Sequence, residues 1–463
     1  MFQHIHEKLL IGTLLLLPFV SSINVNFLGG VGREGSFYPL FLGVSIWLFT
    51  VVFFRCKIYL PQSWSFVALI IFLFVTVLSG IFNLTSLSQE VFQGVTGTRR
   101  YLLQTAGLGF YFTATLYLYQ IFRCGKRDPL YLFRRCLLIS CMFSLIYTSL
   151  EIAVIFGGME AFQLLSAIDS LFRNTDEAVF YGRVRSLTSE ASYFGMYAAV
   201  VLPWIFSLFI EYNKGWQKIF AVLLLGGFIL AIILTLSRTS YVILCIEAAL
   251  YIFFFRSSIL YYWKQFLLAI FLLAVLGMYT FEIFMSDFSL FDIWAIFESL
   301  VGGGDGIREG SNIARYGSVA AAMDIFLQYP LFGVGFGAYG FYAPDYYPVW
   351  AWRSIEILNW SQNMIGGSWP PVHNLYVRLL AETGIFGLLT WITFCILLLR
   401  DEYIILKKQK EFLRIVYWRN VLITTVGIFA CGFNVDGFRL FAMWILFSLV
   451  WFEYGRVLRA GER

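Results

Sequence analysis

Long apolar stretches separated by short polar connections follow one another along almost the whole chain. A helix that crosses a bilayer needs about 20 mostly apolar residues, and the sequence contains twelve stretches of that kind. They lie at roughly 9–27, 37–54, 64–83, 101–122, 136–157, 191–210, 219–236, 240–255, 265–284, 374–399, 420–436 and 440–455. The pattern predicts an all-α polytopic membrane protein with about twelve transmembrane helices.

The composition excludes the alternatives to a membrane protein. Hydrophobic residues make up 60% of the 463 positions and charged residues 13%, about half the charged share of an average soluble domain. So few polar groups cannot cover so much apolar surface in water, which excludes soluble globular, disordered and nucleic-acid-binding classes. Lipid is the expected solvent, and residues 1–463 are predicted to form a single integral membrane domain.

The basic residues predict the orientation of the spans. With the N-terminus in the cytoplasm and the spans alternating, cytoplasmic segments hold 21 of the 33 basic residues, including all nine Lys. The external segments hold twelve, and all of them are Arg. Because Lys and Arg concentrate in cytoplasmic loops, the chain is predicted to have both termini inside and a basic cytoplasmic loop over 400–419.

One external segment is far longer than an ordinary connection between helices. It runs from about 285 to 373, between the ninth and tenth spans, and holds 12 of the 39 Gly and five Trp. Its eight acidic residues outnumber its three Arg. We therefore expect this large external loop to carry functional residues.

His373 is the only histidine on the predicted external side, because His4 and His6 belong to the cytoplasmic tip. A single histidine either forms a structural hydrogen bond or acts as a general base or acid. Without a second external histidine, a His-cluster metal site cannot form there. We expect no metal and no other cofactor.

Arginines form the second chemical signal. Arg185, Arg238, Arg315 and Arg378 lie at or near predicted membrane mouths, on a face without Lys. Guanidinium groups suit bidentate phosphate recognition, although arginine also snorkels at membrane interfaces. Several of them near His373 favour a phosphorylated or pyrophosphorylated lipid ligand.

Acidic and aromatic residues complete the candidate set. Glu190 is either a catalytic base or a partner of an arginine, and Glu382 is placed for an i,i+4 ion pair with Arg378. Glu247 is an intramembrane carboxylate, which is a functional candidate by default. Trp369 and Tyr316 are predicted to bind sugar rings, although aromatic residues also form belts at membrane interfaces.

Four segments together resemble the O-antigen ligase/polymerase superfamily. They are Leu236-Ser-Arg-Thr-Ser240, Ser311-Asn-Ile-Ala-Arg315, Tyr329-Pro-Leu-Phe-Gly-Val-Gly-Phe-Gly337 and His373-Asn-Leu-Tyr-Val-Arg-Leu-Leu-Ala-Glu-Thr-Gly384. Their order, their spacing over roughly 236–387 and the large external loop before the tenth span all fit that family. The fold that the resemblance implies is similar to the GT-C class.

The resemblance implies transfer of a glycan from undecaprenyl pyrophosphate at the outer, periplasmic face of the bacterial inner membrane. Ligases of this family pass the glycan to lipid A-core, and polymerases pass it to another lipid-linked repeat unit. By the same resemblance, His373 would activate the acceptor, and Arg238 and Arg315 would bind the donor pyrophosphate. The lipid-linked donor and acceptor are the expected partners, alongside membrane lipid, a flippase and a chain-length regulator.

A further segment favours the polymerase over the ligase. Arg183-Val-Arg-Ser-Leu-Thr-Ser-Glu-Ala-Ser-Tyr-Phe-Gly195 resembles the Arg…Glu-Pro-Ser segment of polysaccharide polymerases, with Ala191 in place of the proline. A transporter is the alternative of a different class, suggested by twelve spans and Glu247, but no pair of broken helices supports it.

The predicted residues suit direct displacement with inversion. Pyrophosphate is a good leaving group, so arginines that neutralise its charge could replace a metal or nucleotide. A base removes the proton of the acceptor hydroxyl as it attacks the anomeric carbon. A retaining reaction would need a carboxylate nucleophile as well, for which Glu190 is the candidate.

Overall fold

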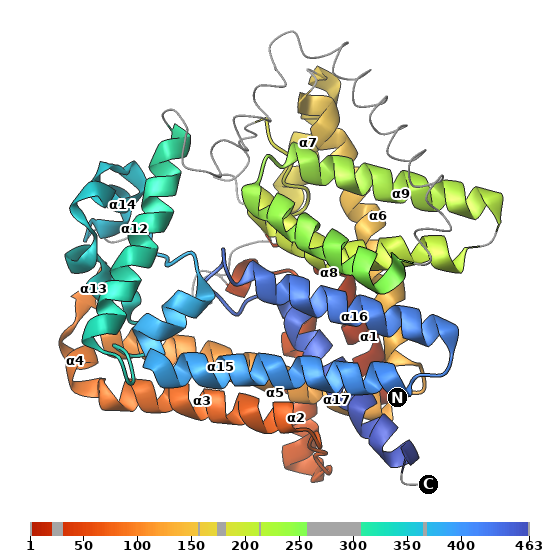
Figure 1. Cartoon of the computed structure of the whole chain (residues 1–463), viewed down its shortest axis with the longest axis horizontal. Helices are drawn as coiled ribbons and strands as arrows, with labels where there is room; N and C mark the ends of the chain where they lie inside the picture. Colours follow the sequence, from red (N-terminus) through yellow and green to blue (C-terminus); the bar gives the residue numbers. More distant parts are fainter. Residues whose placement is uncertain are drawn as a thin grey trace.

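The computed structural model is almost entirely helical (Figure 1). It describes residues 2–20, 31–155, 158–173, 182–212, 214–256, 307–363 and 368–461. Within these ranges the only sheet is a two-stranded antiparallel hairpin, formed by β1 (Val91–Phe92) and β2 (Val95–Thr96). The predicted all-α class is confirmed.

Nine helices of the described ranges are long and apolar enough to cross a membrane. They are α2 (Phe37–Phe54), α3 (Trp64–Phe82), α6 (Pro129–Ile155), α8 (Ala191–Glu211), α9 (Gly215–Leu234), the helix Arg238–Arg256, α15 (Leu375–Lys408), α16 (Phe412–Cys431) and α17 (Phe441–Gly461). Each overlaps one of the stretches predicted from the sequence. The chain is a multi-pass membrane protein.

The other three predicted spans have different outcomes. α5 (Gly97–Cys124) is a 28-residue helix over the stretch predicted at 101–122. The first helix, α1 (Phe2–Leu15), begins before the predicted 9–27 and has 14 residues, about 21 Å at 1.5 Å per residue, which is too short to span the hydrocarbon core. The stretch at 265–284 lies outside the described residues.

Two helix ends near the C-terminus differ from the bounds of the predicted spans. α15 continues to Lys408 and α16 begins at Phe412, so most of 400–419 is helical and the connection is short. α16 ends at Cys431 rather than at 436. Segment 432–440, which we call the α16–α17 loop, is therefore outside both helices, and hydropathy placed half of it in a span because Phe433 and Val435 are apolar.

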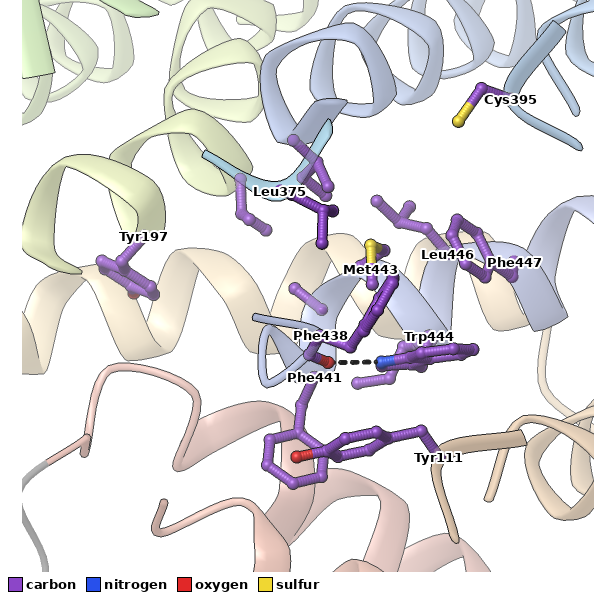
Figure 2. Packing of buried hydrophobic residues seen from close by; sticks show 14 of the residues in the cluster. Tyr111, Tyr197, Leu375, Cys395, Phe438, Phe441, Met443, Trp444, Leu446 and Phe447 are labelled. Carbon is purple, nitrogen blue, oxygen red and sulfur yellow. Dashed lines mark hydrogen bonds between the residues drawn. The ribbon is translucent and has the colours of Figure 1, made fainter. Parts of the chain in front are cut away.

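Packing brings distant segments together. α15 lies against α3, α16 against α8, and α17 against α5. Large aromatic side chains fill the interior between these helices, including the fully buried Trp391 and Trp444. Figure 2 shows Trp444 donating its indole N–H to the Phe438 carbonyl at 2.8 Å, next to Tyr111. This contact anchors the α16–α17 loop to the core beneath it.

The described part of the large external loop is helical. It contains α12 (Ile307–Gln328), α13 (Tyr339–Tyr346), the 3₁₀ helix η3 (Val349–Arg353) and α14 (Ile355–Ser361). These helices gather with α4 (Leu84–Gln89) at one end of the molecule, whereas α7 (Met159–Phe172) lies beside α6 (Figure 1). The residues 285–306 and 364–367 of that loop lie outside the described ranges.

Candidate functional site

The two longest segments of the family resemblance pack against each other through their backbones. Val334 and Gly335 donate their N–H groups to the carbonyls of Ala381 and Glu382, both at 3.0 Å. Gly384 has a φ of 65°, and a Cβ there would lie 2.2 Å from the Leu331 carbonyl oxygen. Only glycine permits this backbone at such close approach, so the motif glycines join the two segments rather than cradle a phosphate.

His373 occupies a strained position at the entrance to α15. Its φ of 59° is left-handed, which is uncommon for a residue with a side chain. Asn374 follows as the N-cap, accepting the Val377 N–H at 3.1 Å, and Pro370 and Pro371 precede it. Strain of this kind persists when surrounding contacts enforce it, and it concentrates at functional sites.

The α16–α17 loop supplies the contacts that hold this entrance. The Asp436 carboxylate accepts the Val372 N–H at 2.7 Å, and the Gly432 carbonyl accepts the Leu375 N–H at 2.7 Å. Asn434 Oδ1 accepts from Arg315 of α12 at 2.6 Å. One loop thus fixes the residues on either side of His373 and brings Arg315 to it.

His373 has the electrostatic properties of an uncharged base. Burial and, to a smaller extent, the positive charge of Arg315 lower its pKa to about 4, and the charge of Asp436 opposes both. Its Nε2 is buried without a hydrogen-bond partner, and its ring lies 5.5 Å from that of Trp360. The imidazole is therefore neutral at neutral pH, with a ring nitrogen that the protein does not use.

The nearby arginines differ in how many of their N–H donors already have a hydrogen-bond partner in the protein. Arg378 forms the predicted ion pair with Glu382 at 2.9 Å, and also donates to the Asp436 carbonyl at 2.5 Å and to Gln104 at 3.4 Å. Arg315 bonds Asn434, but its Nε is buried without a partner. Arg378 therefore has the contacts of a positioning residue, while Arg315 retains donor capacity.

Arg100 is a second arginine with unused donors. It lies in the first turn of α5, its guanidinium carbon is 4.0 Å from the ring centroid of Trp369, and its Nε is buried without a partner. The charges of Arg378, Glu382 and Asp436 all act on it. Trp369, predicted to bind sugar, is thus stacked beneath an arginine of the site.

Arg439 extends the cluster toward α8. It donates to the Tyr193 hydroxyl at 3.3 Å, and the neighbouring Tyr193, Glu34 and Asp436 raise its pKa although burial opposes them. Burial raises the pKa of Glu34 to about 8, against the lowering effect of Arg439. A narrow cavity of about 50 Å³ meets these groups, and its other walls are apolar, among them Leu17 and Met196.

Arg185 belongs to a different cluster. It faces Glu151 of α6 at 3.9 Å and Asp169 of α7 at 3.6 Å, and Arg173 reaches the same Asp169 at 3.4 Å. The Ser186 N–H also donates to Glu151, at 2.7 Å. The structure therefore places Arg185 among compensating carboxylates, and no contact between it and His373 is observed within the described ranges.

Glu190 and Arg238 lie at the N-terminal ends of α8 and of the helix Arg238–Arg256. Glu190 is the N-terminal flanking residue of α8, accepts from the Ser192 hydroxyl at 3.3 Å and acts electrostatically on Tyr193. Arg238 opens its helix directly after the turn at Leu236, whose φ is 49°. Tyr193 bonds Arg439, so these two side chains link Glu190, at the start of α8, to the cluster around His373.

The two remaining candidates stand apart from His373. Tyr316 on α12 is 61% exposed. Glu247 is buried within the helix Arg238–Arg256, facing Gly427 of α16, and both its carboxylate oxygens lack a hydrogen-bond partner. Neither residue contacts the His373 cluster in the described part of the chain.

The sequence prediction missed Arg100, Asn434, Asp436 and Arg439. A signal was present for two of them, because Asn434 and Asp436 interrupt a stretch predicted as membrane-spanning, where polar groups mark functional positions. No group of three or more His, Cys, Asp or Glu suited to a metal ion occurs among the described residues. Independence from metals stays a prediction.

A comparison with known families matches part of this region. The family model of O-antigen ligase matches residues 220–392, a region that includes Arg238, Arg315, His373 and Arg378. No curated protein matches the chain. The resemblance predicted from the sequence is confirmed over this region, where the chain is similar to the O-antigen ligase family.

Proposed function

We propose that the protein is a glycosyltransferase that polymerises the repeat units of a surface polysaccharide. The donors would be repeat units linked to undecaprenyl pyrophosphate, at the periplasmic face of the bacterial inner membrane. The observation that carries the proposal is the neutral, unbonded His373 beside arginines whose buried N–H groups have no partner. A neutral base next to cationic hydrogen-bond donors suits a glycosyl transfer whose leaving group is an anion.

Arg315 and Arg100 are the best placed to bind the pyrophosphate. Both keep a buried Nε without a partner, and a polar group left in that state costs about 1–3 kcal/mol. An anionic ligand would remove this cost. Arg439, next to the apolar cavity lined by Leu17 and Met196, adds positive charge where the lipid chain would approach. Arg238 remains a candidate from the family resemblance.

Donor binding would also activate His373. Burial is the main cause of the low pKa of His373, and the positive charge of Arg315 adds to it. A bound pyrophosphate would compensate that charge. The pKa would then rise toward neutrality, where a general base is most effective. This order of events lets the base gain strength only when the donor is in place.

The chemical step would be a single displacement. His373 takes the proton of an acceptor sugar hydroxyl while that oxygen forms a bond to the anomeric carbon of the donor. The bond from the anomeric carbon to the pyrophosphate oxygen breaks, and its electrons leave with undecaprenyl pyrophosphate, held by the arginines. Attack opposite the leaving group inverts the anomeric configuration.

The choice of polymerase over ligase rests on the segment 183–195. Its resemblance to polymerase segments lies on the chain that leads into α8, whose Tyr193 bonds Arg439. A flippase would supply the lipid-linked units at the same membrane face, and a chain-length regulator would limit the product. A ligase would use the same residues with a lipid A-core acceptor.

Replacement of His373 by alanine tests the proposal. We expect lipopolysaccharide from the native host with the His373→Ala variant to show core carrying a single repeat unit on a gel. Bare core with polymer retained on undecaprenyl pyrophosphate would instead identify a ligase. His4→Ala, an exposed histidine at the N-terminal tip, is the matched control and should give the normal ladder. A normal ladder from His373→Ala at equal membrane abundance would refute both enzymes.

A further inference from the structure

A polar groove lies between α12, α13 and the end of α4, separate from the cluster around His373. Its volume is about 750 Å³, within the usual range for small-molecule sites. Four tyrosines and three carboxylates line it, namely Tyr329, Tyr342, Tyr346, Tyr347, Glu90, Asp324 and Asp345. The groove lies at the end of the molecule where α4, α12 and α13 gather (Figure 1).

Contacts within the groove hold the tyrosine side chains in place. The rings of Tyr329 and Tyr342 meet edge to face with centroids 6.0 Å apart, and the Tyr346 hydroxyl donates to Gln328 at 2.5 Å. Burial raises the pKa of Tyr342 to about 12, and the charge of Glu90 adds to this effect. Tyr342 therefore keeps its hydroxyl proton, and its ring combines an apolar face with a hydrogen-bonding edge.

The carboxylates exclude anionic ligands. Glu90, Asp324 and Asp345 form no ion pair with any residue of the described ranges, and no Lys or Arg lines the groove. Three uncompensated negative charges repel phosphate and anionic lipid headgroups. The same carboxylates accept hydrogen bonds from sugar hydroxyl or amino groups, and aromatic faces cover the apolar faces of sugar rings.

The groove adjoins the arginine site through one aromatic layer. Phe341 lines the groove, and its ring packs edge to face on Trp369 with centroids 5.0 Å apart. Trp369 also packs against Arg100, whose guanidinium carbon lies 4.0 Å from its ring centroid. A ligand could therefore place an anionic part at the arginines and an uncharged part in the groove.

We propose that this groove is a glycan subsite that binds uncharged or amino-bearing sugar units distant from the pyrophosphate. The inference rests on the proposed function, since it assigns the groove to the same lipid-linked glycan. The two sites differ in charge. The cationic arginine site holds the pyrophosphate, and the acidic, tyrosine-lined groove holds sugars. Weaker binding in the groove would shorten the polymer without removing the chemical step.

The test measures binding of sugar and of pyrophosphate separately, with the full-length protein in nanodiscs. Lipid-free repeat-unit oligosaccharides, released by mild acid from the surface glycan of the native host, are titrated by saturation-transfer NMR. We expect Tyr342→Ala and Asp345→Asn each to weaken their binding about three- to tenfold. Tyr342→Phe keeps the ring and should retain most of the affinity. Tyr403→Ala, a half-exposed tyrosine on α15 outside the groove, should bind like the wild type.

Undecaprenyl pyrophosphate without sugar is the second probe, and its binding should be unchanged in both groove variants. Wild-type oligosaccharide affinity in Tyr342→Ala and Asp345→Asn, or no binding by the unmodified protein, would overturn the subsite. Failure of the proposed function gives a different result. In that case sugar-free undecaprenyl pyrophosphate does not bind, and His373→Ala leaves the polymer intact, whatever the groove variants do.

Discussion

Two clusters of arginines that are largely buried differ in how their charge is compensated. In the cluster of α6 and α7, Arg173 and Arg185 face Glu151 and Asp169, two cations for two carboxylates. In the cluster around His373, four arginines (Arg100, Arg315, Arg378 and Arg439) face three carboxylates (Glu34, Glu382 and Asp436). The second cluster therefore carries excess positive charge.

The difference separates structural arginines from candidate ligand-binding arginines. A buried cation needs a partner, because removing a charge from water costs several kcal/mol after relaxation. Arg185 forms ion pairs with Glu151 and Asp169, whereas Arg315 and Arg100 form no ion pair with a carboxylate of the described ranges. We infer that an anion completes the second cluster and that the first is complete as it stands.

The same substitution in both clusters tests this difference in charge compensation, and Arg315→Lys is expected to have the largest effect. Lysine keeps the positive charge but lacks the planar guanidinium group, which can donate two parallel hydrogen bonds to one phosphate group. Removal of one oriented donor from a developing anion costs on the order of a hundredfold in rate, so we expect that loss in polymer formation. The measurement is transfer from lipid-linked repeat units in nanodiscs, and near-normal transfer would remove Arg315 from the pyrophosphate site.

Arg185→Lys is the matched variant in the compensated cluster. Its effect should appear in stability, with a loss of about 1–3 kcal/mol in the free energy of unfolding, because hydrogen bonds to charged groups contribute that much. Transfer activity for each folded molecule should stay within about twofold, since the predicted anion does not touch this cluster. Thermal unfolding and activity are measured on the same preparation. A large loss of activity without loss of stability would return Arg185 to the donor site, as the sequence suggested.

The sequence predicted the spans well where apolar runs end at polar residues, as at α2 and α3. It failed where a polar residue is satisfied by distant partners. α15 was predicted to end at 399, but its helix continues through Asp401, whose carboxylate accepts hydrogen bonds from Ser63 and from Ser65, the latter at 2.6 Å. Hydropathy along one helix contains no information about partners on another.

The same limit applies to the site. His373, Arg315 and Arg378 were predicted from motif spacing, and the structure brings them together on the α16–α17 loop. Arg100 was missed because its role depends on Trp369, far away in the chain. Arg185 was grouped with the others because its carboxylate partners on α6 and α7 lie in separate segments. Compensation of charge is a property of packing, which sequence spacing does not show.

The smallest expected effect is a shift in the pH dependence of activity, which distinguishes the two clusters most directly. Protonated His373 cannot accept a proton, so activity should fall as the pH drops through its pKa. In the free enzyme the pKa of His373 is about 4, so kcat/KM should fall only as the pH approaches that value. With donor bound, the charge of Arg315 is compensated and the pKa rises, so the acid limb of kcat should lie at higher pH than that of kcat/KM.

The direction of this separation depends on which cluster holds the anion. An anion at Arg315 acts on His373 directly, together with Asp436, whereas an anion at Arg185 would leave the His373 pKa near its value in the free enzyme. Arg185→Lys should therefore preserve the separation between the two acid limbs. Coincident limbs in the wild type would mean that the donor does not compensate Arg315, and the excess charge around His373 would then need a different anion.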